Sequence, residues 1–305
     1  MNDTESISGR FADEHGIDVT RIAPEEKSTI FWLETSWYEL NLAVQQFAES
    51  LILDPTWGLL WSMLTKTRAH ASASIALYVV GQPSSAEVVT RTVMEASVNV
   101  LYILASNRPD RLARYLSSYV VEQRDKCEKW RRTAEQCPEA HTSHFAGIAQ
   151  KQKALQLFEQ LLRQLLPEIG AGFIEDAVWP SVFERFQSVG NELGYRTEYT
   201  ALCSQTHDAA EDLLNQVHIR SMGIPQLSDM LENETRLFSR MLIHAGIGYF
   251  LEACDRYAET FDQQSAIPIV RESRVKVAET AQCICDSIRK LVWESEFGAR
   301  RRADD

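Results

Sequence analysis

Residues 85–106 constrain the fold more than any other stretch of this sequence. They follow the pattern Ser84-Ser85-Ala86-Glu87, a capping box of the kind that opens a helix. Apolar side chains then cover most of the circumference of that helix. Because such a helix has no broad polar face to turn towards water, we expect it to lie in the middle of a bundle of other helices.

The rest of the chain also carries residues that are typical of the starts and ends of helices. Asp54-Pro55 places a capping side chain before a first-turn proline, and Trp179-Pro180-Ser181 opens another helix. Alternating β-branched runs bounded by hairpin turns are missing, which argues against a sheet. We therefore expect an all-α bundle of about eight or nine helices. Their expected positions are near residues 29–52, 55–80, 85–106, 109–135, 143–165, 180–192, 196–218, 228–262 and 273–296.

The chain divides into three parts. Residues 1–27 are polar and acidic with little periodic apolar content, which predicts a disordered, mobile arm. Residues 28–298 predict a single helical-bundle domain, whose weakest point is the turn at Gly170-Ala171-Gly172. Residues 299–305 predict a frayed tail.

Composition limits the classes of function. The chain has 305 residues and a net charge of −12, which argues against a surface that follows a phosphate backbone. Its six cysteines lack the density of a disulfide-stapled secreted domain, and its start lacks a secretory signal. No stretch looks long and apolar enough to span a bilayer. We expect a cytoplasmic protein with reduced thiols and no membrane partner.

The helix expected at 85–106 carries one polar strip, formed by Arg91, Glu95, Asn99 and Tyr102. Arginine placed four residues before glutamate is the weaker order for a surface ion pair. If the strip faces the interior, its charges need partners, because lone buried charges are costly. We therefore take Arg91 and Glu95 as candidate catalytic residues, and Asn99 and Tyr102 as candidate binding residues.

Three histidines, His70, His207 and His244, lie on or beside apolar helix faces. A histidine in such a place is more often a hydrogen-bonded core residue than a catalyst, but two of them could meet in one polar pocket. His207 is a candidate catalytic residue, and His70 and His244 are candidate binding residues. We expect no metal and no cofactor, because a zinc knuckle, a phosphate loop and a dinucleotide fingerprint are all missing from the sequence.

Two motifs resemble those of a known family. Residues 91–104 begin as an Arg-x-x-x-Glu-Ala helix, and residues 199–207 follow the pattern Tyr-x-x-Leu-x-Ser-x-x-His. This pairing resembles DUF5677, a bacterial all-helical family of unknown function, over roughly residues 35–260. The resemblance implies a helical fold and no activity. It draws attention to Arg91, Glu95, Tyr199, Ser204 and His207, which adds Tyr199 and Ser204 to the candidate binding residues.

A looser similarity is to HEPN-type helical ribonucleases, which use an arginine and a histidine across a dimer interface without metal. In that chemistry the histidine is a general acid or base and the arginine stabilises developing phosphate charge. The spacings Arg240-x-x-x-His244 and Arg68-x-His70 are both too short for the HEPN pattern.

These observations favour a cytoplasmic, bacterial, non-catalytic interaction or regulatory protein, whose core holds the Arg91–Glu95 strip as a buried polar network. One alternative is a metal-independent ribonuclease of a toxin or phage-defence system. The other is a small-ligand sensor whose pocket is that network. Partners stay open between a second copy of the chain, a protein and an RNA. The ribonuclease would use Arg91 or Arg240 with His207, His70 or His244.

Overall fold

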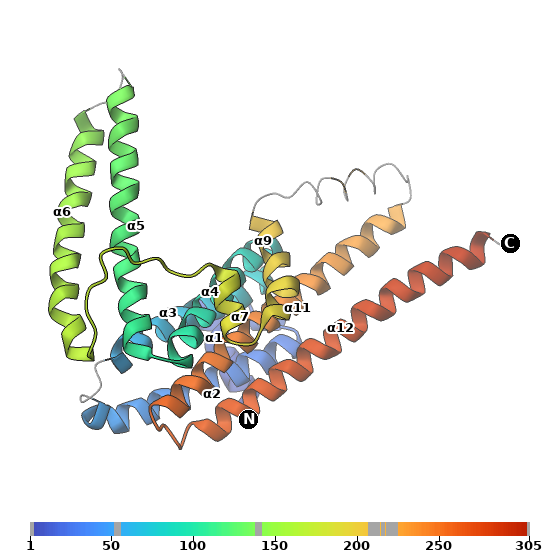
Figure 1. Cartoon of the computed structure of the whole chain (residues 1–305). Helices are drawn as coiled ribbons and strands as arrows, with labels where there is room; N and C mark the ends of the chain where they lie inside the picture. Colours follow the sequence, from blue (N-terminus) through green and yellow to red (C-terminus); the bar gives the residue numbers. More distant parts are fainter. Residues whose placement is uncertain are drawn as a thin grey trace.

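The structure is a computed structural model that describes residues 3–51, 56–137, 142–206, 214, 217 and 225–303. Within these residues the regular elements are helices and no strand occurs (Figure 1), so the predicted all-α fold is confirmed. The α-helices are α1 (Asp3–His15), α2 (Pro24–Leu51), α3 (Thr56–Val79), α4 (Pro83–Ala105), α5 (Arg108–Gln136), α6 (Thr142–Leu165), α7 (Val182–Ser188), α8 (Glu192–Gly194), α9 (Thr200–Thr206), α11 (Pro225–Thr260) and α12 (Ile267–Ala303). Two 3₁₀ turns, η1 (Val19–Arg21) and η2 (Leu166–Ile169), and a π-helix, η3 (Tyr195–Tyr199), complete the described elements.

Helix α4 lies in the middle of the bundle, as its sequence predicts. It packs lengthwise against α3 and α11, and it also contacts α5, α7 and α9. Val93, Val98 and Ile103 are at most 1% exposed. The bundle therefore covers the apolar surface of α4 on several sides.

The start of α4 differs from the expected capping box. The helix begins at Pro83, and the side chain of its N-cap residue Gln82 makes no capping hydrogen bond. Glu87 is 2% exposed and accepts a hydrogen bond from Ser239 of α11. Tertiary burial of this carboxylate has replaced its local capping role. The other predicted cap, at Asp54-Pro55, lies outside the described residues.

Helix α4 also corrects the expectation that no segment could cross a bilayer. By length and composition, Pro83–Ala105 qualifies as a candidate span, because only Arg91 and Glu95 are charged between residues 88 and 105. Half of its most apolar window is buried inside the protein. The core helix of a bundle passes the same test as a membrane helix.

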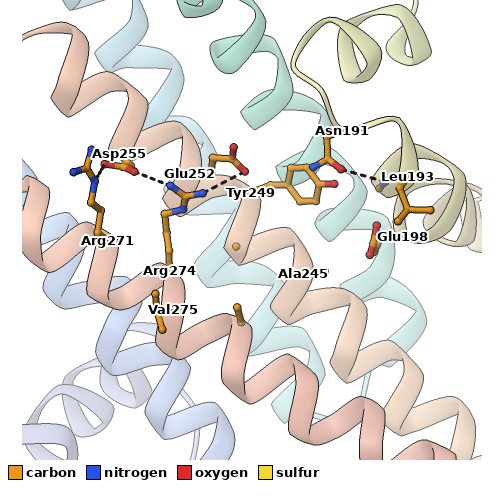
Figure 2. Close-up of a pocket in the computed structure, with 13 residues that line it drawn as sticks. Asn191, Leu193, Glu198, Ala245, Tyr249, Glu252, Asp255, Arg271, Arg274 and Val275 are labelled. Atoms are coloured by element: carbon orange, nitrogen blue, oxygen red, sulfur yellow. Dashed lines mark hydrogen bonds and ion pairs between the residues drawn. The ribbon is translucent and has the colours of Figure 1, made fainter.

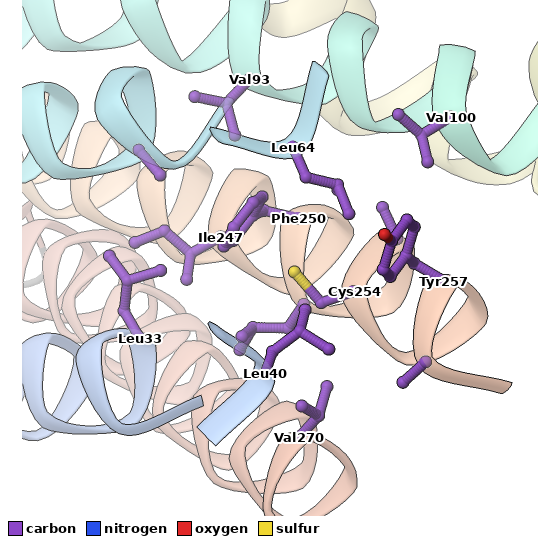
Figure 3. Packing of buried hydrophobic residues seen from close by; sticks show 14 of the residues in the cluster. Leu33, Leu40, Leu64, Val93, Val100, Ile247, Phe250, Cys254, Tyr257 and Val270 are labelled. Carbon is purple, nitrogen blue, oxygen red and sulfur yellow. The ribbon is translucent and has the colours of Figure 1, made fainter. Parts of the chain in front are cut away.

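The main hydrophobic core forms where α2, α3, α4, α11 and α12 meet (Figure 3). Helix α11 contributes two large aromatic side chains, Phe250 and Tyr257, and both are fully buried. Leu40 of α2 and Leu64 of α3 pack in the same cluster. Each such side chain contributes about 1.5–3 kcal/mol when it leaves water, so this core supplies the stability on which the smaller elements rely.

The prediction of a disordered arm over residues 1–27 is wrong. Asp3–His15 forms α1, which packs against α2. Phe11 is 2% exposed, and Lys27 Nζ lies 3.0 Å from Glu5 Oε1. Helix α1 contains few apolar residues, so the apolar periodicity of its sequence is weak. Its stability comes from packing on α2. At the other end, the expected tail at 299–305 is helical as far as Ala303.

Helices α5 and α6 form a two-helix arm that projects away from the bundle (Figure 1). Along its length the arm exposes several large apolar side chains, among them Tyr119, Phe158 and Leu161. The base of the arm meets α4 at the end of the polar strip. There Arg111 of α5 stacks on the ring of Tyr102, with 3.9 Å between its guanidinium carbon and the ring centroid.

Two glycines of α11 test the close packing of this helix on α4. A Cβ atom added at Gly246 would overlap the side chain of Thr90, whereas one added at Gly248 would meet nothing within 4 Å. Alanine is favoured over glycine inside a helix by about 1 kcal/mol. Gly248→Ala should therefore raise the free energy of unfolding by up to about 1 kcal/mol. Gly246→Ala should lower it by about 1–3 kcal/mol, because α4 must shift.

Urea unfolding of the two variants measures both effects, and each variant serves as the control for the other. Equal changes in the free energy of unfolding would contradict the close approach of α11 to α4 at Gly246.

Candidate functional site

The polar strip of α4 meets partners from the chain segment that follows the arm. Tyr199 Oη donates a hydrogen bond to Glu95 Oε2 over 3.1 Å, and Arg185 Nη2 lies 3.3 Å from Glu95 Oε1. Arg91 Nε donates to Tyr199 Oη over 3.4 Å. We call Arg91, Glu95, Asn99, Arg185 and Tyr199 the Glu95 network. Arg185 and Glu95 form the ion pair of this network, in which the Arg185 side chain is 4% exposed and the Glu95 side chain is 36% exposed.

Arg185 is the member of the network that sequence reasoning missed. It lies on α7, which a capping box opens: Glu184 N donates to Ser181 Oγ over 3.3 Å, and Ser181 N donates to Glu184 Oε2 over 2.7 Å. The Arg185 side chain is 4% exposed and also donates to Asn99 Oδ1 and to the backbone oxygen of Pro180. The capping box predicts where α7 starts. No local pattern marks Arg185, because its carboxylate partner is 90 residues away.

Asn99 and Tyr102 extend the network towards the arm. Trp179 Nε1 donates to Asn99 Oδ1 over 3.3 Å. The ring of Tyr102 meets the ring of Trp179 edge-on, with their centroids 5.2 Å apart. These contacts fix the chain just before α7. Tyr102 therefore supports the network through ring packing.

Two members of the network, Arg91 and Tyr199, keep one proton state near neutral pH. Burial, with the neighbouring Glu95 carboxylate, raises the pKa of Tyr199 to about 12, so its phenol stays neutral and keeps donating to Glu95. The hydrogen bond to Tyr199 raises the pKa of Arg91, which stays charged. A general acid or base needs a pKa close to the working pH. Neither Arg91 nor Tyr199 meets that requirement.

The structure leaves two predicted residues out of this network. His70 is exposed on α3. His244 is 2% exposed in a separate cluster, where its Nδ1 donates to the backbone oxygen of Arg240 over 2.7 Å. Arg240 is itself paired with Glu25 and Glu26 at the start of α2. Two further candidates are not described: the side chain of Ser204, which lies within α9, and the whole of His207.

A pocket of about 700 Å³ opens between η3, α11 and α12 (Figure 2). Helices α11 and α12 form one wall, and residues 191–198 form the other. A Cβ atom added at Gly194 would overlap the hydroxyl of Tyr249, so glycine is required where this second wall meets α11. The lining residues are Asn191, Leu193, Gly194, Glu198, Ala245, Gly248, Tyr249, Glu252, Asp255, Arg271, Arg274, Val275 and Ala278.

The charges of the pocket are distributed unevenly between its walls. Asp255 is 5% exposed and binds both arginines of the pocket, which lie on α12: Arg271 Nε lies 3.1 Å from Oδ1, and Arg274 Nη1 lies 2.7 Å from Oδ2. On the opposite wall Glu198 is half-buried and accepts a hydrogen bond from Thr197 Oγ1 over 2.7 Å. In the part of the chain that the structure describes, no cation lies within ion-pair distance of Glu198.

One turn of π-helix joins the pocket to the Glu95 network. Consecutive residues of η3 serve the two features, because Glu198 lines the pocket and Tyr199 binds Glu95. Between them the ring of Phe186 packs on Tyr199 at 5.4 Å and on Tyr249 at 5.6 Å. Single π-helical turns are frequent at functional sites. The sequence does not reveal the pocket, because its lining comes from three separate stretches of the chain and none of them carries a recognisable motif.

The described part of the chain shows no side-chain arrangement suited to a metal ion. Among the residues that can be described, no group of three His, Cys, Asp or Glu side chains is placed to hold a metal ion. Asp255, the most buried carboxylate of the pocket, is already bound by two guanidinium groups.

A comparison with known protein families shows to which family the chain belongs. A family model described as a family of unknown function, DUF5677, matches residues 58–223, which is more than half of the chain. The chain belongs to this family. No curated protein and no solved structure matches it. The DUF5677 match includes the whole Glu95 network and the η3 wall of the pocket, whereas α11 and α12 both lie entirely beyond it.

Buried His244 predicts how stability depends on pH. Burial lowers the pKa of its imidazole below the ordinary value, although the hydrogen bond to the backbone oxygen of Arg240 and the charge of Glu26 oppose this effect. The unfolded chain, where the pKa is about 6.5, therefore binds a proton that the folded chain rejects. The free energy of unfolding should fall as the pH decreases below about 6.5.

Urea unfolding between about pH 7.5 and about pH 5 measures this dependence. His244→Gln should lose less stability over that range than the wild type. His70→Gln, at an exposed position, should lose as much as the wild type. The same loss in all three proteins would show that His244 is not the group responsible.

Proposed function

We propose that this DUF5677 protein is a non-catalytic regulatory protein that binds a small ligand in the pocket between α11, α12 and η3. One observation carries the proposal: η3 contributes Glu198 to the pocket and Tyr199 to the Glu95 network. The pocket also has a suitable size, because small-molecule sites occupy about 300–1,000 Å³. A ligand held against η3 is therefore linked to the helix at the centre of the bundle.

The link works through the conformation of η3. A ligand shifts an equilibrium only when it binds two conformations with different affinity. A ligand that contacts Glu198 favours one arrangement of this turn, and the same turn sets the position of the Tyr199 hydroxyl on Glu95. Loosening or tightening that hydrogen bond is the proposed signal.

The state of the polar groups favours a non-catalytic role. Glu95 accepts from two groups, Tyr199 is a neutral phenol, and the Arg185 side chain is 4% exposed. The ribonuclease alternative gains no support from the described histidines. His244 is 2% exposed and its neighbour Arg240 is paired with two glutamates, so neither is open to a phosphodiester.

In this proposal the protein acts in the bacterial cytoplasm on a partner protein. The six cysteines, which are all free, suit a reducing compartment. The α5–α6 arm exposes Tyr119, Phe158 and Leu161, and groups of exposed apolar side chains mark protein contacts.

Filling the pocket tests the proposal. Leucine at Gly248 would project into open space, so Gly248→Leu should keep the fold and occlude the pocket, while Gly248→Ala leaves most of it open. Saturation-transfer NMR with a fragment set of amines, acids and neutral aromatics should detect binders of the wild type. Gly248→Leu should bind them at least about tenfold more weakly, and Gly248→Ala should retain them.

Fragments that bind Gly248→Leu as well as the wild type would contradict the proposal. So would a wild-type protein that binds none of them at millimolar concentration.

A further inference from the structure

We infer that the ligand of this pocket is a small organic cation, with an amine or guanidinium group carried on an apolar body. The inference rests on the proposed function and names the class of its ligand. Two carboxylates beside Tyr249 support it: Glu198, which no described cation approaches within ion-pair distance, and Glu252, whose ion pair with Arg274 is long at 3.8 Å.

The positive charges of the pocket are already occupied. Asp255 binds Arg271 and Arg274 at ion-pair distance, and it is 5% exposed. Arg271 also pairs with Glu259 on the same helix as Asp255. The Arg271 and Arg274 side chains are 52% and 37% exposed, but an anionic ligand would have to compete for them with the carboxylates of Asp255 and Glu259. The α12 wall is therefore poorly suited to an anion.

The negative charges are less well matched. Glu198 accepts a hydrogen bond from the Thr197 hydroxyl, and the described residues bring no cation within ion-pair distance of it. Glu252 is 39% exposed, and the nearest guanidinium nitrogen, of Arg274, is 3.8 Å away. This distance is long for a charge-assisted hydrogen bond. Both carboxylates therefore retain acceptor capacity for a ligand.

Tyr249 lies between these two carboxylates (Figure 2). Burial raises the pKa of its phenol, and Glu198 and Glu252 both raise it further, which shows that their charges act on the same hydroxyl. An ammonium group has three donors and no acceptor. Here it would meet the carboxylates of Glu198 and Glu252, while the Tyr249 ring between them is 8% exposed.

The rest of the pocket suits an apolar body. Leu193 is 74% exposed and Val275 is 55% exposed at its edges. Three small residues, Ala245, Gly248 and Ala278, also line the pocket and leave room for a ring or a short alkyl chain. A ligand with both parts would cover the exposed apolar side chains and satisfy the acceptors at once.

Three probes that share one phenyl body test the inference: 2-phenylethylamine, 2-phenylethanol and phenylacetate. Their affinities for the full-length chain are measured by saturation-transfer NMR at low ionic strength, where screening is weak. The amine should bind about tenfold or more tightly than the carboxylate. Glu198→Gln should weaken the amine about tenfold and leave the alcohol unchanged. Glu192→Gln is the matched control, because Glu192 lies on the same wall but pairs with Arg196 outside the pocket.

Two outcomes would overturn the cation assignment. One is phenylacetate binding as tightly as the amine, and the other is Glu198→Gln leaving the affinity for the amine unchanged. If Gly248→Leu still abolishes binding in either case, ligand binding in the pocket is retained and only the assignment of the ligand as a cation is wrong. If Gly248→Leu binds all three probes as the wild type does, or if no probe binds the wild type, the inference and the proposed pocket function both fail.

Discussion

The chain segment that includes η3, and the pocket that it helps to form, both depend on the carboxylate of Glu95. It accepts from Arg185 of α7 and from Tyr199 of η3, and it projects from the central helix α4. Residues 170–199 form only short helical pieces, which are too short to be stable alone. The Glu95 network fixes this segment against the bundle. The same segment supplies Asn191, Gly194 and Glu198 to the pocket, so the pocket depends on that carboxylate as well.

Ion pairs with a buried member specify an arrangement more than they stabilise it, because desolvation offsets much of their attraction. In the Glu95 network that member is Arg185, whose side chain is 4% exposed, and a second cluster is similar. The second joins Glu26 of α2, Arg240 of α11 and, through a backbone oxygen, His244. Both clusters sit where helices distant in the sequence must meet in one register. Apolar packing alone would tolerate neighbouring registers.

Much of the fold follows from the sequence, because helix caps, prolines and apolar periodicity are local signals. The interior position of α4, and the need of its strip for partners, also follow from residues 85–106 alone. Arg185 could not be predicted, since its burial depends on a glutamate 90 residues earlier in the chain. Helix α1 was missed because Phe11 is stabilised by α2 and not by its own neighbours. The pocket was missed because it exists only where three distant stretches meet.

The central claim is that Glu95 and Arg185 hold residues 170–199 on α4 through a direct interaction. A double-mutant cycle tests it most directly, with Glu95→Gln, Arg185→Met and the double variant compared with the wild type by urea unfolding. This account predicts a coupling free energy of about 1–3 kcal/mol between the two positions. Effects that simply add, with a coupling near zero, would contradict it.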